Sequence, residues 1–187
     1  MQISVSPAEK MFSVHRFRPI FAAVLVLLFV GFLYFATGFF FAKSVLEELI
    51  DDDVVWQEVK NLPIDETLLP KMLAEIEGIK AKERSGEKCE QYAVRTRRAG
   101  YFNSPTYGVV WLNENEIWKI GKTCLREQKR YPLGLGDERL IFEKQFVGNE
   151  MQCLVVEKVK LYAYALSAEN MKREKKFSLP PGNKIYR

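Results

Sequence analysis

A long apolar segment near the N-terminus constrains the fold of this chain more than any other feature. Residues 19–42 contain no charged side chain, and a helix needs about 20 mainly apolar residues to cross the hydrocarbon core of a bilayer. A cleaved signal peptide is the alternative, but its apolar stretch is usually about 7–15 residues long and ends in small residues. This segment is longer and ends in Phe39-Phe40-Phe41-Ala42. It therefore predicts a transmembrane helix that serves as the uncleaved signal anchor of a single-pass membrane protein.

The charges that flank this segment predict its orientation. A lysine and two arginines precede it: Lys10, Arg16 and Arg18. Lys43 follows it, but acidic residues soon dominate in residues 47–53. Lysine and arginine are enriched on the cytoplasmic side of membrane helices. We therefore expect residues 1–18 to be cytoplasmic and the chain after residue 42 to be extracytoplasmic, in a periplasm or outside the cell.

The composition after the anchor excludes several kinds of enzyme. The only histidine is His15, so Ser-His-Asp and Cys-His catalysis are ruled out beyond the membrane segment. Cys89, Cys124 and Cys153 are not spaced like zinc ligands. In an oxidising compartment one pair of them could form a disulfide and leave the third thiol free. Basic residues outnumber acidic ones in residues 100–187, which suits a phosphate-bearing partner but equally an ordinary solvated surface.

The residues between the anchor and position 90 have the pattern of helices. Apolar side chains recur at helical spacing in residues 44–60 and again in residues 67–82, with Pro63 and Pro70 near the break between them. We expect residues 43–90 to form a helical stalk or a small helical subdomain.

The pattern changes in residues 91–187, which predict a small α+β domain with an antiparallel sheet flanked by helices. The expected strands are residues 91–96, 107–112, 117–121 and 139–146. The polar connection at 113–116 predicts that the second and third of them form a hairpin. A short helix is expected from Thr123 or Cys124 through Tyr131. A longer helix should begin after Asn149, a plausible N-cap.

An ordered set of residues in this domain indicates a possible site. It consists of a strand-end motif, a helix arginine, a glutamate inside an otherwise apolar helix and an asparagine near the C-terminus: Lys119-Ile120-Gly121-Lys122-Thr123, Arg126 or Arg130, Glu157, and Asn183. This order resembles the GIY-YIG nuclease superfamily. In that family two strands form a hairpin and are followed by a helix arginine, a metal-binding glutamate and a C-terminal asparagine.

The resemblance assigns the two motif strands. Gly108–Leu112 looks like the GIY strand, and Trp118–Thr123 looks like the YIG strand in the variant that begins with lysine. The positions of the two family tyrosines hold Val110 and Lys119. Tyr107, or Tyr101, would then supply a hydroxyl from nearby.

The resemblance also implies the role of each residue in metal-dependent phosphodiester cleavage. Glu157 would bind Mg²⁺, a hard cation that accepts carboxylate and water ligands. Arg130, beside its aromatic neighbour Tyr131 and with Arg126 as the second choice, would hold a phosphate oxygen. Lys119 would act as a general base or as a positive charge on the phosphate. Asn183 would orient Glu157 or the backbone.

Ordinary structural roles compete with these assignments. Glu157 could be a helix-flank glutamate paired with Lys158 or Lys160, Arg130 a solvated arginine and Asn183 a turn residue. Two other functions stay open beside a membrane-anchored nuclease that acts on nucleic acid. The domain could be an inactive module that binds an envelope protein, or a structural envelope protein in which the helices of residues 44–82 form oligomers.

Overall fold

The computed structural model describes residues 43–82 and 86–185. The predicted cytoplasmic segment and the predicted membrane helix at 19–42 lie outside these residues. Within the described part of the chain, no helix is long and apolar enough to cross a membrane. Residues 42–187 form one compact unit with the predicted α+β class, an antiparallel sheet flanked by helices. The domain boundary expected at residue 90 falls inside a strand, β1 (Lys88–Thr96).

The helices before the sheet pack onto a later helix. Residues 43–49 are helical and are followed by α2 (Asp53–Val59) and α3 (Leu69–Lys80). Asp52 caps α2, because its carboxylate accepts the backbone N–H groups of Val54 and Val55. Apolar side chains of these helices share one core with the helix that follows the sheet.

The main sheet has three antiparallel strands in the order β4-β1-β5, so β1 lies in the middle. Its other strands are β4 (Ile117–Thr123) and β5 (Leu140–Asn149). A second sheet consists of β2 (Gly100–Ser104) and β3 (Gly108–Leu112). The chain between β1 and β4 is therefore an inserted hairpin with its own pairing.

The predicted hairpin of residues 107–112 and 117–121 is wrong. β3 pairs with β2, and β4 pairs with β1. The polar turn at 113–116 does form, with Asn115 in the left-handed region at φ 65°. However, Thr96 at the end of β1 bonds to this turn, accepting from the N–H of Asn115 through its carbonyl and from that of Glu116 through its hydroxyl. The turn consequently directs the chain from one sheet to the other.

The expected helix from residue 123 or 124 through 131 is reduced to α4 (Glu127–Arg130). Thr123 belongs to β4 instead, and Cys124 forms a disulfide with Cys89 that leaves Cys153 free and buried. Tyr131 flanks the end of α4 and is followed by Pro132. A residue before a proline disfavours helical backbone angles, so the helix ends here.

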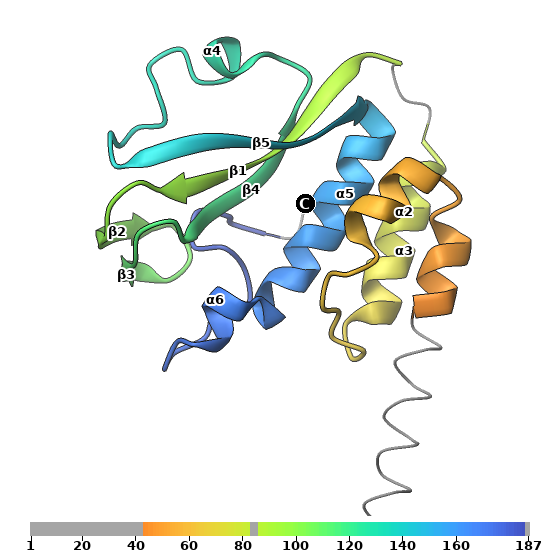
Figure 1. Cartoon of the computed structure of the whole chain (residues 1–187), viewed down its shortest axis with the longest axis horizontal. Coiled ribbons are helices and arrows are strands. Elements are labelled where there is room, and N and C mark those ends of the chain that lie inside the picture. The colour runs from red at the N-terminus through yellow and green to blue at the C-terminus, as the bar shows by residue number, and fades with distance from the viewer. Residues whose placement is uncertain (1–42, 83–85, 186–187) are drawn as a thin grey trace, which may run out of the picture. The chain divides into compact units, whose positions relative to one another are not determined.

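The long helix after Asn149 is confirmed as α5 (Glu150–Ala163). Asn149 and Gln152 form a reciprocal capping box, in which each side chain accepts from the other's backbone N–H. Figure 1 shows α5 between the sheet and helices α2 and α3. A 3₁₀ turn (Tyr164–Leu166) and α6 (Ala168–Met171) follow.

Candidate functional site

Strand pairing brings a tyrosine against the glycine of the Lys119-Ile120-Gly121 motif. Tyr92 on β1 is the register partner of Gly121 on β4. A Cβ atom at position 121 would lie 2.6 Å from the Tyr92 hydroxyl oxygen, which is far inside van der Waals contact. The glycine is therefore required because the tyrosine ring crosses β4 at this point.

Tyr92 is the centre of an aromatic cluster. Its hydroxyl oxygen lies 2.7 Å from that of Tyr131, and its ring stacks on Phe142 with centroids 4.5 Å apart. Burial, followed by the hydrogen bond to Tyr131, raises the pKa of Tyr92 above its ordinary value. The Tyr92 hydroxyl therefore stays protonated near neutral pH and can donate a hydrogen bond.

Arg130 joins this cluster and Arg126 does not. Interaction with the Tyr92 hydroxyl raises the pKa of Arg130, and the Arg130 guanidinium lies 5.8 Å from the centroid of the Tyr131 ring. Arg126 is exposed and precedes α4 without a side-chain capping bond. Of the two arginines considered from the sequence, only Arg130 lies beside the tyrosines.

Glu157 on α5 is within electrostatic range of several basic side chains. Burial raises its pKa from 4.5 to about 7, while the positive charges of Lys158, Lys122, Lys119 and Arg130 oppose this increase. Within residues 43–82 and 86–185 its carboxylate makes no ion pair or hydrogen bond, so the alternative pairing with Lys158 or Lys160 is not seen. Those two lysines pair with other glutamates, Glu75 and Glu58.

Lys119 and Lys122 differ in whether they form an ion pair. Lys122 forms an ion pair with Glu150, with 2.6 Å between Nζ and Oε1. Lys119 has no ion pair within the described part of the chain, and lies two positions before Gly121 on the same strand. Lys119 therefore remains the available positive charge of the motif.

Asn183 and Tyr107 hold the C-terminal tail. The Asn183 side chain accepts from the backbone N–H of Ile120 and donates to its carbonyl, at 3.0 and 2.8 Å. It thus satisfies the free edge of β4 in the way a neighbouring strand would. The Tyr107 hydroxyl lies 2.9 Å from that of Ser178 and accepts from the N–H of Leu179. Both residues position the tail, and in the described part of the chain neither forms a hydrogen bond with Glu157.

A divalent cation at this site would have fewer than three protein ligands of the His, Cys, Asp or Glu type among the described residues. Among the residues that the structure describes, no group of three or more His, Cys, Asp or Glu side chains could hold a metal ion. Mg²⁺ is commonly bound through one or two carboxylates, with water and substrate phosphate completing its ligands. Glu157 has no competing ion-pair partner in the described structure, so it suits this arrangement.

The sequence analysis did not assign Tyr92 to the site, and it named Tyr131 only as the aromatic neighbour of Arg130. Tyr92 lies in a predicted strand, but the expected hairpin assigned a different partner to β4. Only the pairing shows that this tyrosine faces Gly121.

The raised pKa of Glu157 predicts how stability depends on pH. The folded chain holds this proton up to about pH 7, whereas an ordinary glutamate releases it near 4.5. Its contribution to stability is therefore complete below pH 4.5 and is lost as the pH rises to about 7. Glutamine does not titrate, so Glu157→Gln lacks this loss of stability. The unfolding free energy of the variant minus that of the wild type should therefore be about 2 kcal/mol larger at pH 8 than at pH 5.

Urea unfolding of the full chain in neutral detergent measures this difference. Glu174→Gln, at an exposed position, is the matched control and should show the pH dependence of the wild type. An equal pH dependence in Glu157→Gln and the wild type would contradict the raised pKa.

Comparisons with protein-family models, with curated proteins and with solved structures find no match for this chain.

Proposed function

We propose that the region after the anchor is a GIY-YIG-like phosphodiesterase that cleaves nucleic acid with the help of a divalent metal ion. One observation carries the proposal. The strand paired with Lys119-Ile120-Gly121 is β1, and it brings Tyr92 to this motif together with Arg130 and Tyr131. In this proposal β1 and β4 correspond to the family's two paired strands, so β1 replaces Gly108–Leu112 as the first of them, and Tyr92 takes the place of a motif tyrosine.

Each side chain has a role that its surroundings support. Arg130 offers two parallel N–H donors to a phosphate oxygen pair, and Lys119 adds a point charge. The hydroxyls of Tyr92 and Tyr131 can donate to the attacking water or to a phosphate oxygen. Glu157 would hold the cation, which when bound would neutralise the charge that develops on the phosphate.

Metal-dependent cleavage is the direct test. The full chain, purified in neutral detergent, is incubated with Mg²⁺ and with plasmid, single-stranded DNA or RNA. We expect cleavage by the wild type, a rate that rises with pH through about 7 as Glu157 ionises, and loss of cleavage in Glu157→Gln. Arg130→Gln should lose most of the activity and Arg126→Gln little, because only Arg130 reaches the tyrosines.

The opposite result also has a clear meaning. A folded wild-type chain that cleaves none of these substrates would overturn the proposal. The domain would then be better described as a binding module for an envelope protein. Equal losses in Arg126→Gln and Arg130→Gln would contradict the assignment of Arg130.

We also propose that residues 19–42 anchor the chain with its domain outside the cytoplasm. The Cys89–Cys124 disulfide supports this location, because disulfides persist in oxidising compartments. The chain should stay in the membrane fraction after alkaline carbonate extraction, and external protease that is given access to the outer face of the cytoplasmic membrane should digest the domain. Release by carbonate, or protection from external protease, would contradict the anchor or its orientation respectively.

A further inference from the structure

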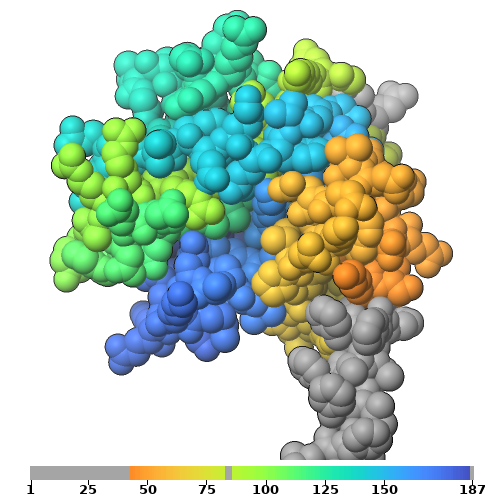
Figure 2. Space-filling view, in the orientation of Figure 1, coloured from red at the N-terminus to blue at the C-terminus, as the bar shows by residue number. Residues whose placement is uncertain are grey.

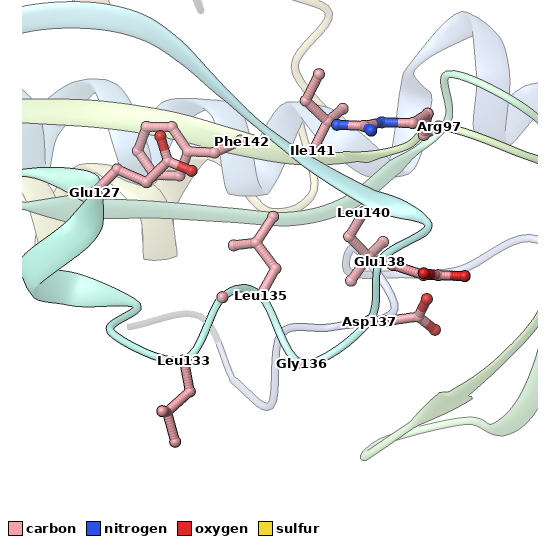
Figure 3. A pocket seen from close by; sticks show the side chains of 11 residues that line it. Arg97, Glu127, Leu133, Leu135, Gly136, Asp137, Glu138, Leu140, Ile141 and Phe142 are labelled. Carbon is pink, nitrogen blue, oxygen red and sulfur yellow. The ribbon is translucent and has the colours of Figure 1, made fainter.

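A pocket opens between the start of β5 and the loop at residues 131–139. Its volume is about 670 Å³, and Figure 3 shows Leu135 pointing into it while Leu133 points away. Leu140, Ile141 and Phe142 of β5 form its other wall. Figure 2 shows the segment after β4 next to β5 on the molecular surface.

The pocket and the candidate site share an aromatic ring and a helix. Phe142 lines the pocket and stacks on Tyr92. Glu127, at the first position of α4, lines the pocket, while Arg130 at the last position interacts with Tyr92. A group in the pocket would therefore lie beside a phosphate held by Arg130.

The loop that walls the pocket is held in place by its own contacts. Gly134 and Gly136 have φ values of 77° and 82°, which favour glycine. Asp137 forms an ion pair with Arg139 at 2.6 Å, and the Arg139 guanidinium lies 4.3 Å from the centroid of the Phe102 ring. These contacts hold the loop in the conformation that forms the wall, without the need for a bound ligand.

The polar groups of the pocket are mainly hydrogen-bond acceptors. Glu127 and Glu138 line it and have no ion pair within the described structure, whereas Asp137 is already engaged by Arg139. Apolar walls, an aromatic ring and free carboxylates suit a flat ring that carries N–H donors. Arg97 on one side and Lys129 and Arg130 on the other can neutralise the flanking phosphates.

We propose that this pocket binds an unstacked nucleobase with an exocyclic amine, next to the phosphate at the candidate site. The inference rests on the proposed function, and it makes single-stranded nucleic acid the substrate class. Single-stranded bases are recognised by stacking on aromatic side chains and by hydrogen bonds to their edges. A carboxylate accepts from the amine of cytosine, whereas uracil presents a carbonyl oxygen at the same position.

Binding without cleavage tests the pocket directly. The full chain in neutral detergent and EDTA is titrated into fluorescent dC12 and dU12, which differ at the pyrimidine position that the carboxylates would read. We expect dC12 to bind more tightly, by roughly 5- to 150-fold, which is the discrimination expected of one well-placed pair of hydrogen bonds. The double variant Glu127→Gln/Glu138→Gln should lose this preference.

Matched controls separate the pocket from general charge effects. Glu114→Gln/Glu174→Gln makes the same charge change at exposed positions elsewhere and should keep the preference for dC12. Leu135→Trp should fill the pocket and reduce dC12 binding to the level of dU12, with circular dichroism confirming that the variant is folded.

The outcomes distinguish this inference from the proposed function. In one outcome the wild type cleaves nucleic acid, but the dC12 preference is unchanged in Glu127→Gln/Glu138→Gln and in Leu135→Trp. This result would overturn base binding in the pocket and leave the proposed nuclease function standing. A dC12 preference that these variants remove, in a chain that cleaves nothing, would support the pocket and overturn the nuclease. Equal affinity of the wild type for dC12 and dU12 would overturn the pocket.

Discussion

Replacing Glu75 by alanine should lower the free energy of unfolding by about 3 kcal/mol or more, because it leaves a buried lysine without its counter-ion. Lys158 on α5 is 3 % exposed, and its ammonium lies 2.6 Å from the carboxylate of Glu75 on α3. Glu75 also accepts a hydrogen bond from the Tyr162 hydroxyl. The loss would therefore weaken the packing of α3 on α5.

A surface control and a double variant test whether the unpaired charge of Lys158 causes the loss of stability. Glu77→Ala changes an exposed glutamate on the same helix and should alter stability by about 0.5 kcal/mol or less. The double variant Glu75→Leu/Lys158→Met removes both charges and should recover most of the loss, since apolar replacements of buried ion pairs are often neutral or stabilising. Urea unfolding followed by tryptophan fluorescence measures all of them. A double variant as unstable as Glu75→Ala would show that the buried charge is not the cause.

Reducing the Cys89–Cys124 disulfide should cost about 4 kcal/mol of stability by the chain-entropy model for a separation of 35 residues. The bond joins the beginning of β1 to the residue after β4, next to the paired residues Glu90 and Thr123. It therefore closes the loop that contains the inserted β2–β3 hairpin. Without it, the β1–β4 pairing that carries Tyr92 and Gly121 must be formed against a larger loss of chain entropy.

Thiol counting and unfolding test this prediction together. The oxidised chain should show one reactive thiol, Cys153, after unfolding and none before, because Cys153 is buried. Cys89→Ala/Cys124→Ala should match the stability of the reduced wild type, and dithiothreitol should not change it further. Three reactive thiols in the unfolded, unreduced chain, or a stability that reduction leaves unchanged, would contradict the bond.

Local sequence patterns located most of the secondary structure correctly. The alternation in residues 91–96, the mixed apolar and polar pattern of residues 139–146 and the cap at Asn149 each depend on neighbours in the chain. Such signals predicted β1, β5 and α5, because strand alternation and helix capping are properties of adjacent residues. The α4 segment was predicted too long, since the strand at Thr123 and the disulfide at Cys124 are set by distant partners.

The candidate site was predicted only in part, for the same reason. Lys119, Arg130 and Glu157 were proposed from their order in the sequence, and in the structure Lys119 and Arg130 are among the positive charges that act on the Glu157 carboxylate. Tyr92 was not assigned to the site, Tyr131 was named only as the neighbour of Arg130, and the Asn183 side chain bonds to the backbone of Ile120 at the edge of β4. Whether two strands pair across an insertion depends on long-range contacts that no short window of sequence contains.

The sequence by itself determined that histidine catalysis is absent beyond residue 15, and it predicts a membrane anchor at 19–42, since both follow from which residues are present. It also determined the class of the fold through the periodicity of its apolar side chains. Only the tertiary structure decided that β4 pairs with β1, that Cys124 bonds to Cys89 and that burial raises the pKa of Glu157 to about 7. These features depend on the packing of residues far apart in the chain, because pairing and desolvation arise only when distant elements come into contact.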